Sequence, residues 1–133
     1  MSAHNLIVKT LLEYPAIAAL IGNRKAQAQL PQGCAMPALV YNFISSVPMP
    51  FLNYTNAEPI SIRVQFNPVA KTMAAVDQIH DAIKGVFEFV HQQTIAGKFV
   101  VIITREPSSP LATRDADTGL WSSNQDYLII YIE

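Results

Sequence analysis

The sequence predicts an α+β fold: a mostly antiparallel sheet of about four to five strands, with one long amphipathic helix packed on it and a short N-terminal helix. Ile60–Phe66 alternates strictly between apolar and polar residues, which is typical of a strand with one face in solvent. Val69–Val90 repeats apolar residues every three or four positions opposite charged ones, which predicts an amphipathic helix. Phe99–Thr104 and Asp126–Ile132 are apolar runs of strand length.

Two helical segments are expected before the first strand. A helix over residues 3–13 is predicted by apolar side chains at turn spacing, namely Leu6, Ile7, Leu11 and Leu12. Pro15 prevents its continuation, and a second helical turn is expected over Ala16–Ile21, before Gly22-Asn23. Residues 25–30 fit no single pattern.

Ala38–Ser46 predicts a strand that is apolar on both faces, and we expect it to pair antiparallel with Ile60–Phe66. Phe99–Thr104 and Asp126–Ile132 are also apolar on both faces, and they are expected to form a hairpin. One long and one short helix do not suffice to cover all these faces. A neighbouring subunit is therefore expected to complete the burial.

The start of the long helix has two candidate positions. Asn67-Pro68 offers an N-cap followed by a first-turn proline, whereas Thr72 would cap a helix that begins one turn later. Further along, Glu106–Gln125 is rich in Pro, Ser and Asp, so we expect a long, polar and mobile loop, with Trp121 as its exception.

The connection between the first two strands is less polar than a loop is expected to be. Residues 47–57 hold Pro48 and Pro50 and carry four large side chains, Met49, Phe51, Leu52 and Tyr54. The prolines stiffen the segment, which lowers the ordering cost of presenting those side chains to a partner. A loop folded back onto its own sheet is an equal alternative.

Composition bounds the classes of function. The 133 residues suit a single domain, 1–133. Hydrophobic residues make up 50% and charged residues 14%, which is typical of a folded chain with some apolar surface for partners. A formal net charge of −1 gives no global field for nucleic acid or anionic lipid. The apolar runs are far shorter than the about 20 residues of a membrane helix, and the start lacks the features of a secretory signal, so we expect a cytoplasmic origin.

Metal ligands are scarce in the pattern. On one helix, His80 and His91 would stand three turns apart, roughly 16 Å, which is too far to share an ion. The closer cluster Asp77, His80 and Asp81 fits a solvated helix face better than a cation site. Asp115–Gly119 with Asp126 departs from a calcium loop in the place of its glycine and in its last ligand, and turn residues explain it equally well.

Catalytic and nucleotide-binding motifs are also missing from the sequence. No serine sits in a glycine-flanked elbow, and the single cysteine, Cys34, lies in a proline-rich loop with no histidine near it in sequence. The glycines are scattered, so there is no phosphate-cradling loop. The basic pairs Arg24 with Lys25 and Arg105 with Arg114 are not interleaved with stacking aromatics. We expect no enzyme, no metal and no cofactor.

The order and spacing of several segments resemble the tail completion or tail terminator proteins of long-tailed bacteriophages. The resemblance rests on a helix ending near Ala16–Gly22, on Leu30-Pro31-Gln32 leading to Met36–Tyr41, on the strand Ile62–Phe66 before the long helix, and on the closing strand Asp126–Ile132. It covers most of the chain.

The resemblance implies a small α+β virion subunit that assembles with its own copies as a ring, commonly hexameric, at the head-proximal end of the tail. Such a ring would cap the tail tube, stop its polymerisation and support head-tail joining. Its partners would be the tail tube protein and head-tail connector proteins, with no specific nucleic acid and no membrane. The subunit would be made in the host bacterial cytoplasm and reside in the neck region of the virion tail.

We expect the interface residues in the two long connections. They are Met49, Phe51, Leu52 and Tyr54 in the first, and Arg114, Asp115, Asp117 and Trp121 in the second, where Arg114–Ser123 resembles an interface element that orders on contact. Two alternatives stay open. The first is a neck or head-completion connector protein, and the second is a small-molecule-binding α+β domain or enzyme with His80, Asp77 and Asp81 as its polar centre.

Overall fold

The computed structural model describes residues 3–31, 33–49, 58–106 and 111–132. Its described strands form one mixed sheet of eight strands. In these residues the strands are β1 (Lys25–Gln27), β2 (Ala38–Pro48), β3 (Pro59–Ala70), β4 (His91–Ile95), β5 (Lys98–Arg105), β6 (Thr113–Arg114), β7 (Trp121–Ser122) and β8 (Gln125–Ile132). The helices are α1 (Ala3–Leu12), α2 (Pro15–Ile21) and α3 (Met73–Phe87). The α+β class is confirmed.

The strand order is β1-β2-β3-β8-β5-β4, with β7 paired to one end of β3 and β6 paired to β7. All neighbours along this order are antiparallel except β1 and β2, which are parallel. The expected pairing of the first two long strands and that of the last two are both confirmed. The prediction of four to five antiparallel strands is wrong, because β1, β4, β6 and β7 are too short and polar to be recognised by apolar alternation.

The single long helix predicted over Val69–Val90 is wrong as well. Thr72 caps α3 by accepting a hydrogen bond from the Ala75 N–H at 3.2 Å, so the helix begins at Met73 and not at Pro68. The residues before it extend β3, where Pro68 and Ala70 continue the buried alternation. Three helices of 10, 7 and 15 residues result.

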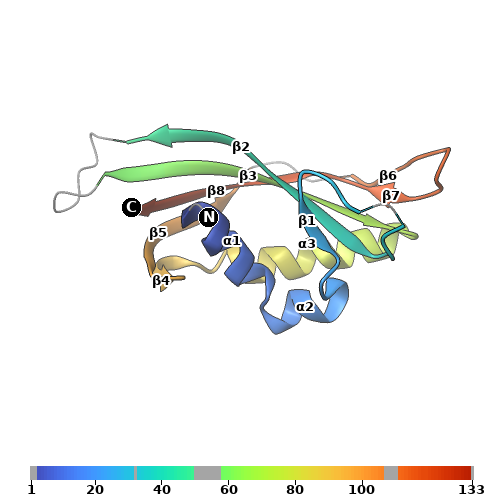
Figure 1. The fold of residues 1–133 in the computed structure, drawn as a ribbon, viewed down its shortest axis with the longest axis horizontal. Coiled ribbons are helices and arrows are strands. Elements are labelled where there is room, and N and C mark those ends of the chain that lie inside the picture. The colour runs from blue at the N-terminus through green and yellow to red at the C-terminus, as the bar shows by residue number, and fades with distance from the viewer. Residues whose placement is uncertain (1–2, 32, 50–57, 107–110, 133) are drawn as a thin grey trace.

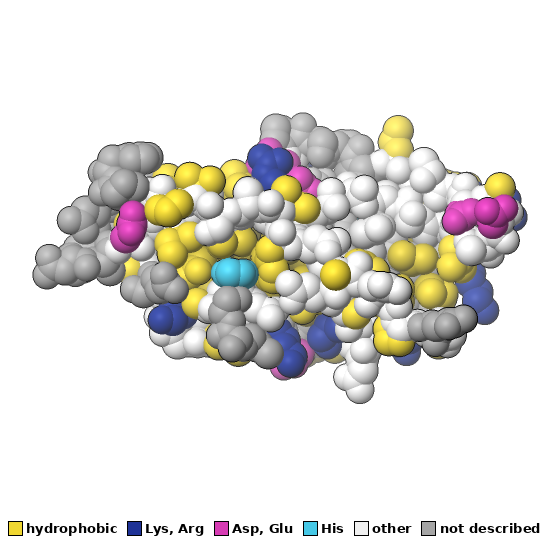
Figure 2. Space-filling model, turned by 45° about the horizontal axis from the view of Figure 1, so that its top comes forward, with side chains coloured by type: hydrophobic (Ala, Val, Ile, Leu, Met, Phe, Trp, Pro, Cys, Tyr) yellow, Lys and Arg dark blue, Asp and Glu magenta, His cyan; other side chains and the backbone are white. Residues whose placement is uncertain are grey.

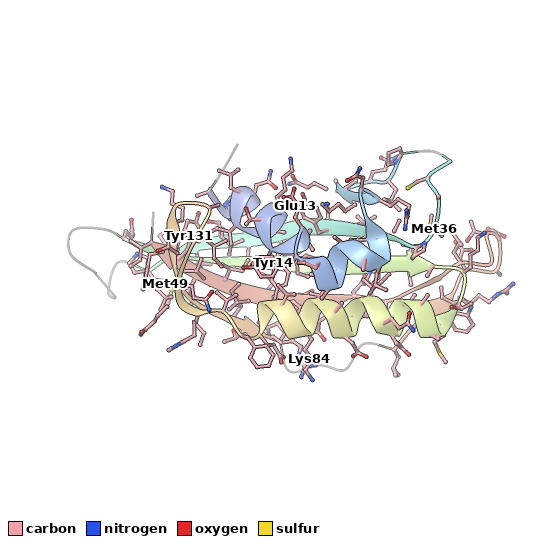
Figure 3. All side chains as sticks on the ribbon, turned by 90° about the horizontal axis from the view of Figure 1, so that it is seen from below. Glu13, Tyr14, Met36, Met49, Lys84 and Tyr131 are labelled. Carbon is pink, nitrogen blue, oxygen red and sulfur yellow. The ribbon has the colours of Figure 1, made fainter. Side chains whose placement is uncertain are left out.

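All three helices lie over the same face of the sheet (Figures 1 and 3). Every second residue of β3 points towards the helices and is buried, and so is its partner in β8. Two such buried pairs are Ile62 with Ile129 and Val64 with Tyr127. Four more buried side chains come from α1, namely Ile7, Val8, Leu11 and Leu12. The core therefore lies between the sheet and one layer of helices.

The centre of the core is an aromatic cluster from three elements. Phe66 of β3 lies with its ring centroid 5.0 Å from Phe87 of α3 and 5.7 Å from Tyr127 of β8. Phe87 and Tyr127 are themselves 5.7 Å apart. These contacts fix the position of α3 over the β3–β8 pair, since aromatic pairs at this spacing attract beyond their burial alone.

The opposite, helix-free face carries an ion network on an otherwise mixed surface. Arg63 of β3 contacts Asp126 of β8 at 3.3 Å and Glu106 at 3.2 Å. Farther along β8, Leu128, Ile130 and Ile132 alternate onto this face and are only partly buried. The expectation that β8 is apolar on both faces is confirmed, although one face has no helix over it.

Replacing Phe66 with Ala is expected to lower the free energy of unfolding by about 3–5 kcal/mol, because it removes the ring that joins α3 to β8 and leaves a cavity. Urea unfolding followed by circular dichroism measures this. Phe89, which is 77% exposed, supplies the matched control, since Phe89→Ala should change stability by less than about 0.5 kcal/mol. Equal losses in the two variants would contradict the assigned core.

Candidate functional site: predicted interface segments and a polar cleft

The first predicted interface segment follows β2. Met49 is half-buried, and its backbone N–H donates to the Pro59 carbonyl at 2.9 Å, which closes the β2–β3 pair at this end. Figure 3 shows Met49 at the end of the molecule where β2 ends and β3 begins. Phe51, Leu52 and Tyr54 lie outside the described residues.

The second predicted segment is a β-hairpin in the part of the chain that is described, and not a loop. Arg114 ends β6 and pairs with Trp121, which begins β7. Asp115 shapes the turn between them: its carboxylate accepts from the Asp117 N–H at 2.9 Å and its carbonyl accepts from the Gly119 N–H at 2.8 Å. The expectation of an unstructured polar segment over Glu106–Gln125 is therefore wrong for residues 113–122.

Met49 and the second segment do not form one site. Met49 lies beside Pro59, at the start of β3, whereas Trp121 pairs with Ala70, at its end. A strand rises about 3.3 Å per residue, so the length of β3 separates them by roughly 36 Å. Met49 and the β6–β7 hairpin therefore mark two ends of the subunit.

A third feature is a polar cleft of about 310 Å³ between α3 and strands β5 and β8. It brings together Asp77, His80, Asp81 and Lys84 of α3, and adds residues distant in sequence, namely Arg105, Gln125 and Tyr127. His80 Nε2 lies 2.6 Å from Ser123 Oγ, which ties α3 to the residue between β7 and β8. Sequence spacing could not reveal these partners, because strand register alone brings them to α3.

Burial and neighbouring charge set the electrostatics of this cleft. Desolvation lowers the pKa of His80, and the nearby carboxylates of Asp77 and Asp81 oppose that shift. Burial also raises the pKa of Tyr127; the charge of Glu88 adds to the rise and that of Arg105 works against it. Arg105 and Glu88 are themselves joined by an ion pair. At neutral pH, His80 is therefore an uncharged hydrogen-bonding group and Tyr127 a neutral phenol.

The His80–Ser123 contact joins α3 to the segment between β7 and β8. Ser123 is only 8% exposed, and among the described residues no carboxylate hydrogen-bonds to the His80 ring to orient it as a base. In the same part of the chain, no group of three or more His, Cys, Asp and Glu side chains has a metal-binding arrangement. None of the helices described is long and apolar enough to cross a membrane.

The fold and these surfaces define a small α+β subunit whose polar side chains join α3 to its sheet. Residues 5–132 match the family described as tail completion protein gp17, and the chain belongs to that family. It is thus a structural or assembly protein of a phage-type tail. The expected resemblance is confirmed over nearly the whole chain.

The fold is also similar to that of a chain in a solved structure described as the virion of native gene transfer agent (GTA) particle. The TM-score is 0.68 at 10% sequence identity, and the match covers 99% of this chain and 96% of that chain. At this identity the likeness concerns the fold alone. A search of curated protein sequences found no match.

Replacing His80 with Gln should remove part of the pH dependence of stability. The folded protein holds this pKa below its ordinary 6.5, so the unfolded chain takes up the proton first as the pH falls. The wild-type contribution is complete above pH 6.5 and is lost as the pH drops towards the folded pKa.

Unfolding free energies of wild type and His80→Gln, measured between pH 7.5 and 5, test this expectation. The gap between the two proteins should shift in favour of the variant as the pH falls. Gln78→Asn, a change at an exposed and non-titrating position of the same helix, is the control and should run parallel to wild type. A constant gap between His80→Gln and wild type would contradict the assigned environment of His80.

Proposed function

We propose that this chain is a tail terminator subunit. Copies form a ring, hexameric by resemblance, at the head-proximal end of the tail tube. The ring caps the tube, stops the addition of further tube subunits and offers its other face for joining the head. Its partners are other copies of the chain, the tail tube protein and the head-tail connector proteins, in the neck region of the virion.

The family match over residues 5–132 carries this proposal. Its mechanism is geometric, because a terminator has to fit the tube end on one side and present no docking surface for a new tube subunit on the other. Repeated modest contacts around a closed ring suffice for such binding, since a ring interface uses the same two unlike patches in every subunit.

Surface features of the described residues support an assembly role. Leu111 and Phe89 are 83% and 77% exposed, and Ile44 and Val47 on β2 are more than half exposed. Exposed hydrophobic side chains mark contact surfaces where they gather into one patch. The polar cleft, in contrast, is mixed in charge, and its histidine already has a partner in Ser123.

We place the tube and connector contacts on the two ends of the subunit described above. One end carries Met49, which Phe51, Leu52 and Tyr54 follow in the sequence, and the other carries the hairpin residues Arg114, Asp115, Asp117 and Trp121. Their separation along β3 suits a subunit that touches different partners on its two sides.

A neck or head-completion connector protein is the alternative within the same class. If the gene for this chain lies next to a major tail protein gene, the terminator is favoured. If it lies next to a portal protein gene, the connector is favoured. The cleft motivates a second candidate, a small-molecule-binding domain, because it gathers Asp77, His80 and Asp81 around one hollow. A ligand screen by thermal shift, together with metal analysis of the purified protein, would reveal that function.

Purified protein mixed with tail tubes is expected to bind only at tube ends and to stop tube elongation. Negative-stain microscopy of the mixture shows the location, and tube length distributions measure the arrest. Light scattering on the protein alone and with tubes reports whether the ring exists before contact or forms on it. A strict monomer that leaves the tube ends bare and the tube lengths unchanged would overturn the proposal.

Replacing Phe51, Leu52 or Tyr54 with Ser is expected to weaken tube-end binding and leave the unfolding midpoint nearly unchanged, since an apolar contact with a partner is lost and the core is untouched. Binding to tubes by sedimentation, together with thermal unfolding, measures both effects. Phe43→Ser is the control, because Phe43 packs against the core and its loss should lower the midpoint sharply. Comparable destabilisation by the loop changes would place those residues in the core.

A further inference from the structure

The sheet ends in two open edges that differ from one another. β4 is the last strand on one side and pairs only with β5 among the described residues. On the other side, β1 covers β2 only at Leu39, Val40 and Tyr41, although β2 continues to Pro48. Residues 42–48 therefore pair with β3 on one side, and no other described strand pairs with them on the other.

Natural proteins commonly protect such edges with charged side chains, prolines or bulges. Neither edge has a Lys, Arg, Asp or Glu, and the open part of β2 has one proline, Pro48, at its end. Residues 42–48 are Asn, Phe, Ile, Ser, Ser, Val and Pro, and β4 reads His, Gln, Gln, Thr and Ile. A single irregularity between Phe43 and Ser45 leaves Ile44 out of the register with β3 and adds no charge to the edge. Both edges thus offer backbone donors and acceptors that another strand can use.

Apolar side chains accompany both edges. Ile44 and Val47 are 52% and 55% exposed on the open part of β2. Beside β4, Phe99 is 39% exposed and pairs with Thr94, and Phe89, two residues before β4, is more exposed still. Figure 2 shows hydrophobic side chains gathered towards the end of the molecule where β2 and β3 project.

Strand direction determines whether β4 of one copy can pair with β2 of another in a parallel or an antiparallel way. The four antiparallel steps from β2 through β3, β8 and β5 to β4 make β2 and β4 run the same way. Rotation about an axis along the strands preserves that direction, so β4 of one copy would lie parallel to β2 of the next. β2 already accepts a parallel partner in β1. Contact between unlike patches is also what a cyclic ring requires.

From these observations we infer that β4 of one subunit adds to the open edge of β2 in the next, so that the sheet continues from copy to copy around the ring. The occupant of each edge is a second copy of this chain. This inference rests on the proposed ring and assigns the two surfaces that build it. The five residues of β4 fit within the seven residues left open on β2.

A cross-linking experiment tests the contact directly. Ser45 pairs with Arg63 and Thr94 pairs with Phe99, which places both on the helix-free face, and both are exposed. A variant with Ser45→Cys, Thr94→Cys and Cys34→Ser, assembled with tail tubes and treated with a short bismaleimide, should give a ladder of covalent oligomers. Each single-cysteine variant should give no ladder.

The outcomes separate the inference from the function on which it rests. Rings seen by microscopy together with a ladder from the double-cysteine protein support the edge contact. Rings without that ladder overturn the edge contact and leave the terminator function standing. A dimer from Ser45→Cys alone shows that β2 pairs with its own copy about a twofold axis, and this also overturns the contact. Protein that neither forms rings nor binds tube ends overturns both proposals.

A lysine placed on the open edge gives an independent measurement. Val47→Lys should lower ring formation by about tenfold or more, because a charge on an edge strand opposes strand addition. Gln78→Lys, at an exposed position of α3, is the matched control and should assemble like wild type. Both variants should keep the wild-type unfolding midpoint. Normal ring formation by a folded Val47→Lys variant would overturn the inference.

Discussion

The contact of Phe66 with Phe87 and Tyr127 is the interaction on which the rest of this structure depends. It joins the central strand β3, the helix α3 and the closing strand β8, which are far apart in sequence. Because β3 pairs with β2, β7 and β8, fixing it against α3 places every strand around it. One aromatic cluster thus sets the position of the sheet relative to its only layer of described helices.

The strong periodicities in the sequence predicted the elements that contribute most to this core. The alternation in β3 and the apolar runs of β2, β5 and β8 are direct consequences of burial, so these strands can be predicted from the sequence. The boundary between β3 and α3 was harder to predict. Val69 suits both a strand and a helix, and the helix start is fixed by Thr72, whose hydroxyl caps the helix one turn later. β4 was missed because an edge strand of polar residues has no buried face to produce alternation.

The candidate sites divide in the same way. The sequence placed Asp77, His80 and Asp81 on one helix face, since that depends only on helical spacing. It could not supply Ser123, Arg105 or Gln125, which reach the cleft through strand register. Asp115 and Asp117 were recognised as turn residues, yet the hairpin around them depends on pairing with the end of β3, a tertiary contact that overrides the weak local preference for a loop.

The described helices cover only one face of the sheet, and this bears on the proposed assembly. Three helices on one face leave Leu128, Ile130 and Ile132 of β8 partly exposed on the other, where the only ion network described is that of Arg63 with Asp126 and Glu106. A domain of this size has few residues with which to build a second layer over the other face of its sheet. An uncovered backbone edge offers donors and acceptors to another chain, and an antiparallel sheet covered on one face leaves its other face in solvent. In the proposed ring, copies of the same subunit would supply the missing neighbours.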